Sequence, residues 1–159
     1  MTRKRKDVLV GAIEAGGTKF VCAVGTGPGS RMLAKTSFQT SNNENPTQLL
    51  ADVASWLSRQ ESKHGKLEAI GIASFGPVDI TSGSPTYGYI TSTPKPGWKN
   101  TDFVGQIRKA FRDIPIGFDT DVNGAALGEY YWGNALGLSD FVYITIGTGI
   151  GAGGMVGGN

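Results

Sequence analysis

Residues 8–24 read VLVGAIEAGGTKFVCAV, and this stretch contains two short runs typical of β-strands, Val8–Ala15 and Lys19–Val24. Gly16-Gly17 lies between the runs, and this dipeptide is typical of a tight hairpin because both turn residues can need a positive φ. The stretch therefore predicts an antiparallel strand pair joined by a glycine turn. A third run, Met32–Gln39, extends the pair into a meander of three strands.

Helix and strand patterns alternate after the meander. One segment begins with a cap and a first-turn proline, Asn45-Pro46, and apolar residues then recur at helical spacing through Leu57. The other expected helices begin at Thr101 and at Thr120-Asp121, and they reach Phe111 and about Tyr131. Strands are expected at Ala69–Phe75, Ile114–Phe118 and Phe141–Ile146, with a short one at Tyr87–Thr91 inside the Gly- and Pro-rich stretch 76–99.

The expected order is therefore β-β-β-α-β-α-β-α-β. A meander followed by alternating helices and strands indicates an α/β layer structure on a mixed sheet rather than an all-parallel one. The length of 159 residues suits one domain. However, seven of the last 13 residues, Gly147–Asn159, are glycine. Because ordering glycine costs more entropy than ordering any other residue, we expect the chain to continue in a parent protein.

Composition excludes several classes of protein. No apolar run approaches the roughly 20 residues that span a membrane, and the single cysteine, Cys22, has no partner for a disulfide. Four of the 15 basic residues lie in the tail 1–7, and the other 11 are outnumbered by 13 acidic residues. Nucleic-acid binding requires a basic face, which is therefore missing. We expect a cytoplasmic protein with no membrane or nucleic-acid partner.

Glycine makes up 25 of the 159 residues, and two glycine-rich turns need a chemical reason. The first is Glu14-Ala15-Gly16-Gly17-Thr18-Lys19, where missing Cβ atoms let backbone N–H groups approach an anion. The Thr18 hydroxyl, the Lys19 ammonium and the Glu14 carboxylate lie in the same segment, and a phosphate bound with Mg²⁺ would use all three. The alternative is a plain hairpin in which the glycines are needed only for their dihedral angles.

The second turn is GTGIGAGG at residues 147–154. It contains the spacing of a dinucleotide fingerprint, Gly149-x-Gly151-x-x-Gly154. A dinucleotide site needs the glycines to open a helix, whereas Met155-Val156-Gly157 is typical of further strand. The P-loop pattern fails as well, because Lys19 follows Thr18 instead of preceding a Ser or Thr. If phosphate binds, we expect it between two hairpin turns.

A third feature is Asp119-Thr120-Asp121-Val122-Asn123, at a junction between a strand and a helix. A helix N-terminus favours negative charge, so Asp121 suits a base that orients and deprotonates a hydroxyl group. A helix cap is the alternative role for this aspartate. His64 and Cys22 are the only residues of their kinds, and we expect a surface imidazole and a core thiol.

Five motifs follow one another along the chain and cover nearly all of it. They are Glu14-Ala-Gly-Gly-Thr-Lys19, Ser74-Phe-Gly-Pro-Val-Asp79, Gly97-Trp98, Thr120-Asp-Val-Asn-x-Ala-Ala-Leu-Gly-Glu129 and Thr145-Ile-Gly-Thr-Gly-Ile-Gly-Ala-Gly153. Together and in this order they resemble the ROK family of sugar kinases, repressors and open reading frames, and most closely its fructokinase branch. The resemblance implies the actin-like, ribonuclease H-like fold of sugar-kinase ATPases, with two α/β domains that close on ATP and sugar.

The resemblance also implies roles for single residues. Asp121 matches the family's catalytic base, and Glu14, where many members have Asp, lies toward Mg²⁺. Thr120 replaces the Asn that touches the sugar in glucokinase-like members. Positions near the ATP phosphates are Gly16, Gly17, Thr18 and Lys19 in the first turn and Gly147, Thr148, Gly149 and Gly151 in the second. Sugar-side positions are Gly76, Pro77, Asn100, Thr120 and Asp121.

For the whole protein, the resemblance implies phosphorylation of a hexose by ATP, with fructose 6-phosphate as the expected product. It divides the chain into a basic tail at 1–7, an ATPase domain at 8–133 and the start of a second domain at 134–159. A structural zinc ion and a homodimer are expected of the full-length protein. The alternatives are a truncated, non-catalytic domain that binds nucleotide or sugar, and a sugar-responsive transcriptional regulator.

Overall fold

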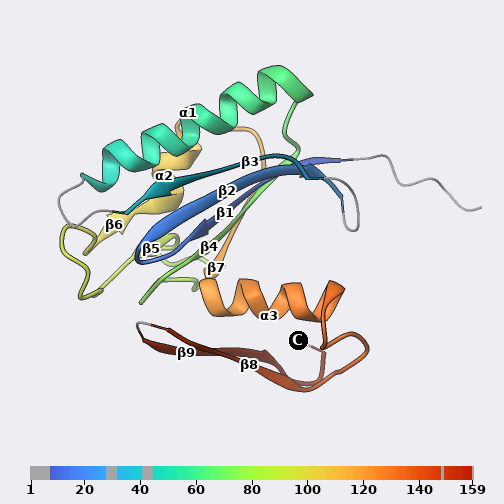
Figure 1. Ribbon diagram of the computed structural model, residues 1–159. Helices are drawn as coiled ribbons and strands as arrows, with labels where there is room; N and C mark the ends of the chain where they lie inside the picture. Colours follow the sequence, from blue (N-terminus) through green and yellow to red (C-terminus); the bar gives the residue numbers. More distant parts are fainter. Residues whose placement is uncertain (1–7, 28–31, 41–44, 148, 159) are drawn as a thin grey trace, which may run out of the picture.

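The computed structural model describes residues 8–27, 32–40, 45–147 and 149–158. Its centre is a five-stranded sheet of order β3-β2-β1-β4-β7 (Figure 1). Its strands are β1 (Leu9–Ala15), β2 (Lys19–Thr26), β3 (Met32–Gln39), β4 (Ala69–Ser74) and β7 (Ile116–Thr120). The other elements are α1 (Pro46–His64), α2 (Phe103–Arg108), α3 (Asp121–Trp132), and the two-stranded sheets β5 (Tyr89–Ile90) with β6 (Thr101–Asp102) and β8 (Phe141–Ile146) with β9 (Ile150–Met155).

The sheet is mixed, as the sequence predicts. β1 pairs antiparallel with β2, and β2 pairs antiparallel with β3, which completes the meander. β4 runs parallel to β1 and β7 runs parallel to β4, because a helical crossover precedes each of them. The carboxyl ends of β1, β4 and β7 therefore lie at one edge of the sheet.

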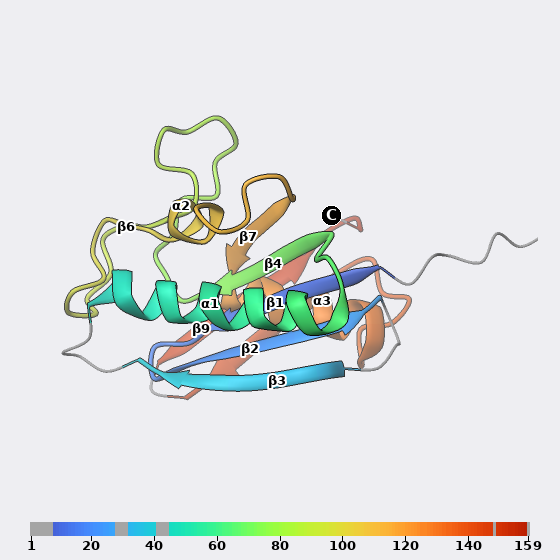
Figure 2. The same ribbon diagram turned by 90° about the horizontal axis from the view of Figure 1, so that it is seen from above.

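One face of the sheet is covered by α1 and α2. Figure 2 shows α1 lying along β1 and β2, with α2 beside it on the side of β7. Apolar side chains at alternate strand positions meet the apolar stripe of α1, in which Leu50, Val53 and Leu57 are fully buried. Burying a side chain of this size stabilises the fold by about 1.5–3 kcal/mol. The Asn45 side chain caps α1 by accepting from the Thr47 N–H, 2.9 Å away.

The other face is covered by α3, and the β8–β9 hairpin packs on the far side of that helix (Figure 1). α3 approaches β4 closely, because a Cβ atom on Gly124 would lie 2.6 Å from the Cβ of Ala73. The hairpin approaches α3 equally closely, because a Cβ on Gly153 would lie 2.8 Å from the backbone of Val122. Glycine at these two positions sets the spacing between the layers.

The β8–β9 hairpin carries apolar side chains that nothing in the described part of the chain covers. Val142 and Ile144 in β8 are 69% and 60% exposed, and Ile146 and Ile150 at its turn are both 79% exposed. Met155, by contrast, is buried. The described residues contain no helix that is both long and apolar enough to cross a membrane.

Several local predictions need correction. Neither Gly16 nor Gly17 has a positive φ. α2 is capped by Asp102, whose carboxylate accepts from the Gly105 N–H at 2.7 Å, so Thr101 is not its cap and lies in β6 instead. α2 also ends before Phe111. His64 closes α1 and its Nε2 is enclosed, so it is not a surface imidazole in a loop.

Candidate active site

Polar side chains gather where the parallel strands end. Ala15, Ser74 and Thr120 are neighbours across β1, β4 and β7, and the row before them is Glu14, Ala73 and Asp119. Neighbouring strands are about 4.8 Å apart, so the backbones of Glu14 and Asp119 are separated by roughly 10 Å. Both residues belong to the face on the side of α3, and only the small side chain of Ala73 stands between them.

Asp121 is the first residue of α3, and the cap of that helix is its neighbour. The Thr120 side chain accepts from the Asn123 N–H at 3.2 Å, which is the N-cap bond. Asp119 accepts from the Thr120 N–H at 2.7 Å and from the Asn123 side-chain amide at 2.8 Å. Asp121 accepts only from the Val122 N–H, 2.9 Å away, among the described residues. The capping role considered for Asp121 is therefore filled by Thr120.

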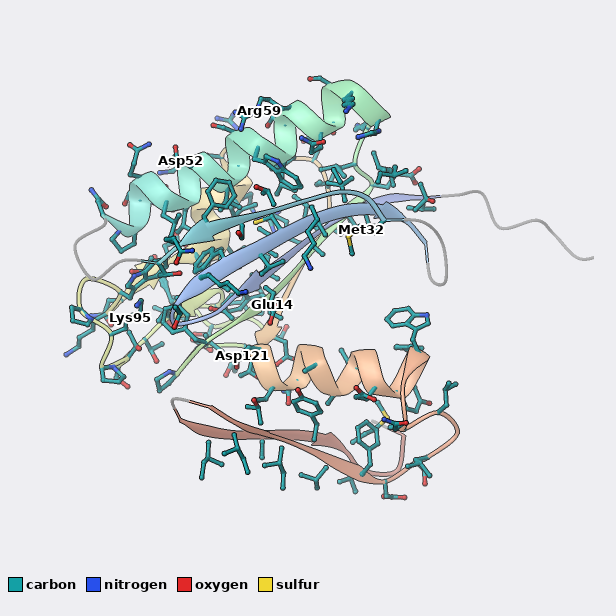
Figure 3. All side chains as sticks on the ribbon, in the orientation of Figure 1. Glu14, Met32, Asp52, Arg59, Lys95 and Asp121 are labelled. Carbon is teal, nitrogen blue, oxygen red and sulfur yellow. The ribbon has the colours of Figure 1, made fainter. Side chains whose placement is uncertain are left out.

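A cavity of about 700 Å³ lies between the sheet and α3. Glu14, Asp119 and Asp121 line it, and Figure 3 shows Glu14 on the sheet and Asp121 at the start of α3. The cavity exists because most other lining positions are small: Ala12, Gly71, Ala73, Gly117, Gly124 and Ala125. A space lined by three carboxylates and little side-chain bulk is able to admit a polar ligand.

The first glycine turn joins β1 to β2 through three residues. The Gly16 N–H donates to the carbonyl oxygen of Lys19 at 3.0 Å, and a Cβ on Gly16 would lie 2.9 Å from that oxygen. Glycine is therefore needed at this position for close approach. The N–H groups of Gly17 and Thr18 donate to nothing in the described ranges, and both residues are exposed. The turn thus presents free backbone donors to solvent.

The second glycine turn joins β8 to β9. The Gly147 N–H donates to the carbonyl oxygen of Gly149 at 2.8 Å, and Thr148 lies outside the described residues. Gly151 is not part of the turn: it lies in β9, where a Cβ would be 2.8 Å from the Val122 side chain. The glycines lead into a strand and not a helix, so they form no dinucleotide fingerprint. This turn, the β1–β2 turn and the start of α3 lie at the same end of the molecule (Figure 1, Figure 2).

Thr91 links Pro77 and Asn100, two of the expected sugar-side residues. The Thr91 N–H donates to the carbonyl oxygen of Pro77 at 2.8 Å, and its hydroxyl donates to the same oxygen at 3.1 Å. The Asn100 N–H in turn donates to the carbonyl oxygen of Thr91 at 3.0 Å. Asn100 has a φ of 57°, a left-handed conformation that asparagine tolerates better than most residues. Gly76-Pro77 and Asn100 thus form one assembly although more than 20 residues separate them.

Asp79, the last residue of the second motif, has a structural role. Its carboxylate accepts from the hydroxyls of Ser84 and Thr86 and from the Thr81 N–H, and these bonds lower its pKa from 3.8 to about 2. The bonds close the exposed loop 79–86. Asp79 does not line the cavity between the sheet and α3.

Sequence reasoning did not assign Asp119, although it lies in a stretch quoted as functional. A signal was available, because Asp119 directly follows the predicted strand Ile114–Phe118 and precedes Asp121 by two residues. Burial raises the pKa of the Cys22 thiol to about 12, which fits the expected core thiol.

The described residues hold no group of three or more His, Cys, Asp or Glu side chains close enough to bind a metal by themselves.

Comparison with known proteins gives a consistent match. A family model described as "ROK family" matches residues 10–159. A protein named putative fructokinase from Bacillus subtilis is 49% identical over 148 residues, which are 93% of this chain and 46% of the relative. A fructokinase from Zymomonas mobilis is 40% identical over 156 residues, 98% of this chain and 50% of the relative. The chain thus spans about half the length of the curated relatives it matches.

Solved structures agree with this match. The chain superposes on a ROK hexokinase from Thermus thermophilus with a TM-score of 0.75 and 31% identity, over 96% of this chain and 48% of the other. A ROK family glucokinase from Streptomyces griseus, solved with glucose and AMPPNP, gives a TM-score of 0.73 and 25% identity over 95% of this chain and 45% of the other. These likenesses confirm the expected actin-like sugar-kinase fold.

Proposed function

The chain belongs to the ROK family, and from this premise we propose that the protein containing it transfers a phosphoryl group from ATP to a hydroxyl of a hexose. Fructose is the proposed hexose, since relatives named fructokinase are 40–49% identical over at least 91% of the chain. The observation that carries the proposal is the position of Asp121. It lies at the start of α3 with its capping role filled by Thr120, and it faces the cavity that Glu14 also lines.

Asp121 is the proposed general base. Its carboxylate takes the proton of the attacking sugar hydroxyl while the hydroxyl oxygen forms a bond to the γ-phosphorus of ATP. The bond between that phosphorus and the bridging oxygen breaks, and ADP leaves with the electron pair. Phosphoryl transfer asks a protein mainly to position the reactants and to stabilise charge. A carboxylate fixed by a helix start meets the first need.

The two glycine turns are the proposed phosphate contacts. The free N–H groups of Gly17 and Thr18 and the exposed side chain of Lys19 are suitable donors for phosphate oxygens. Gly147, Thr148 and Gly149 provide the second turn in this proposal, and Gly151 supports it from β9 by allowing the hairpin to approach α3.

Mg²⁺ is the proposed cofactor, and the donor set of the cavity fits it. Mg²⁺ prefers oxygen ligands and is usually bound through one or two carboxylates together with substrate phosphates. Glu14 is the proposed protein ligand, and Asp119 is a second carboxylate in the same strand row, two strands away. When bound there, Mg²⁺ would neutralise charge on the phosphates.

Sugar contacts are assigned to the assembly of Gly76, Pro77 and Asn100 and to the Thr120–Asp121 junction. Thr120 uses its hydroxyl as a helix cap, so the side chain has a fixed orientation beside the base. A threonine at this position is shorter than the Asn of glucokinase-like members. It also lacks the side-chain amide with which that Asn touches the sugar, which argues against a preference for glucose.

The organisation of the larger protein is also a proposal. Residues 8–133 would form the first domain, the basic residues 1–7 a tail, and 134–159 the start of a second domain. The uncovered apolar face of the β8–β9 hairpin supports this division. A cytoplasmic homodimer, with a structural zinc ion bound outside the described residues, completes the proposal.

The test is an ADP-release assay on the intact protein with ATP, Mg²⁺ and a panel of hexoses. We expect the highest kcat/KM with fructose, and we expect Asp121→Asn to lower kcat by about 10²–10⁴-fold, the usual contribution of a general base. Asp113→Asn is the matched control, because Asp113 is exposed at the opposite edge of the sheet. Full activity in Asp121→Asn would refute the role of the base. ATP binding without transfer to any hexose would identify a non-catalytic domain.

A further inference from the structure

Lys95 is half-buried and links two segments that the proposed function treats separately. Its ammonium group donates to the carbonyl oxygen of Gly17 at 2.5 Å and to that of Thr40 at 3.4 Å. Gly17 lies in the first glycine turn, whereas Lys95 lies in the loop 91–100 that ends at Asn100. Figure 3 places Lys95 at the end of the molecule where the β1–β2 turn lies. The contact joins residues 78 positions apart in the chain.

Lys95 and Thr40 together hold three successive carbonyl groups of the turn. The Thr40 hydroxyl donates to the Gly16 oxygen at 3.2 Å, Lys95 bonds the Gly17 oxygen, and the Thr40 N–H donates to the Thr18 oxygen at 2.8 Å. These peptide bonds are trans. In a trans peptide, the carbonyl of one residue and the N–H of the next point in opposite directions. The N–H groups of Gly17 and Thr18 therefore point away from Thr40 and Lys95, and both are free.

The backbone of Lys95 is itself firmly held. Its N–H donates to the Thr93 hydroxyl at 3.3 Å, and its carbonyl oxygen accepts from the Trp98 N–H at 3.2 Å. Trp98 is fully buried, and its ring lies 5.4 Å from the rings of both Phe20 and Phe75. The packed indole of Trp98 thus holds the short turn in which Lys95 lies. The Lys95 side chain therefore extends to the glycine turn from a well-packed segment.

We propose that Lys95 is a positioning residue, which orients the Gly17–Thr18 peptide so that the Thr18 N–H faces the terminal phosphate of ATP. This inference rests on the proposed kinase function. Two of the three N–H donors of the ammonium group meet carbonyl oxygens of the turn and of Thr40, so the proposed role of Lys95 acts through the turn and not through contact with the phosphate. Because the loop 91–100 also carries Asn100, the sugar-side loop supports the phosphate turn.

The test compares three variants of the intact protein. Lys95→Met keeps the length of the side chain but removes its donors, Lys95→Arg keeps a cation with donors, and Lys99→Met is the matched control. Lys99 lies in the same loop, is exposed, and has no side-chain partner among the described residues. We expect Lys95→Met to lower kcat/KM for ATP by about tenfold, the effect of losing one charged hydrogen bond. KM for the sugar should stay within about twofold, Lys95→Arg should recover most of the loss, and Lys99→Met should match the wild type.

A second measurement does not depend on catalysis. ¹⁵N relaxation of the ligand-free protein reports the order of the Gly17 and Thr18 amides. We expect lower order parameters at both amides in Lys95→Met and wild-type values in Lys99→Met, with equal urea midpoints showing that all variants fold. If the wild type phosphorylates no sugar, the proposed function fails, and the amide data still decide whether Lys95 orders the turn.

Two results would overturn the role of Lys95. Unchanged amide order and unchanged kcat/KM in Lys95→Met, in an active protein, would leave the kinase proposal intact and refute the positioning role. A large loss of kcat/KM with unchanged amide order would also refute it, because it would show that Lys95 contacts a substrate directly.

Discussion

The two faces of the five-stranded sheet differ in what their side chains do. Toward α1 and α2, alternate strand residues are large and fully buried, as Ile13 and Phe20 are. Toward α3, the neighbouring positions are small or charged: Ala12, Glu14 and Gly71 are exposed and line a cavity. Successive residues of a strand point to opposite faces. In β1, residues that pack in the core therefore alternate with residues that line the cavity. A substitution that affects stability and one that affects the candidate site can lie at adjacent positions.

The largest expected effect concerns the covered face. Phe20 stacks on Phe103 and packs on Trp98, so Phe20→Ala should leave a cavity and lower the free energy of unfolding by about 3–5 kcal/mol. The comparison is Val21→Ala, one residue along β2 and on the opposite face, where a half-buried side chain should cost about 1 kcal/mol or less. Urea denaturation of both variants measures the difference. Equal losses would mean that the two faces are equally packed.

A smaller effect is expected where α3 approaches the open face. Gly124→Ala should destabilise the protein by about 1–3 kcal/mol, because the new methyl group would lie 2.6 Å from the Cβ of Ala73. In the same helix, nothing lies within 4 Å of a Cβ on Gly128. Gly128→Ala should therefore stabilise by about 0.5–1 kcal/mol through helix propensity alone. Urea denaturation should show a lower free energy of unfolding for Gly124→Ala and a higher one for Gly128→Ala. A higher free energy of unfolding in both variants would rule out tight contact between α3 and β4.

The smallest effect is a difference in chemical reactivity. Burial raises the pKa of Cys22 on the covered face from 9.0 to about 12. The unfolded chain loses this proton above pH 9 while the folded protein keeps it, so the contribution to stability is complete below pH 9 and is lost as the pH rises toward 12.

At pH 8, an aromatic disulfide reagent should leave native Cys22 unmodified. A cysteine introduced by Ala12→Cys, with Cys22→Ala, should react readily because position 12 is exposed.

A modified Cys22 in the folded wild type would show that the covered face admits water. The stability of Cys22→Ala, measured from pH 7 to pH 11, provides the matching check, because that variant should lack the decline that begins near pH 9.

Sequence patterns were most informative where one face of an element is apolar. The meander, α1 and the start of α3 follow from periodicity and from caps, since these signals lie within a few neighbouring residues. The short strands β5 and β6 were harder to predict, because the Gly- and Pro-rich stretch around them has no period. Thr101 and Asp102 are both good caps, and only the backbone conformation selects Asp102.

The candidate site depends on contacts that no local pattern contains. Glu14 and Asp119 share a row because β1, β4 and β7 pair in one register, and that register is set by packing across the whole sheet. Gly16 is required for close approach to the Lys19 oxygen, and the positive φ that the hairpin pattern predicts for it is wrong. Lys95 meets Gly17 across 78 positions, and no spacing rule reports such a contact.

The parallel direction of β1, β4 and β7 has a practical consequence for engineering. Segments that follow these strands meet at the proposed catalytic end, while segments that precede β4 and β7 lie at the other end of the sheet. Gly65 and Lys66, between α1 and β4, are exposed there, and Gly65 has a φ of 109°. A fluorescent label or an affinity tag inserted between these two residues would leave every proposed ligand contact free, so the protein can be immobilised or followed without blocking its site.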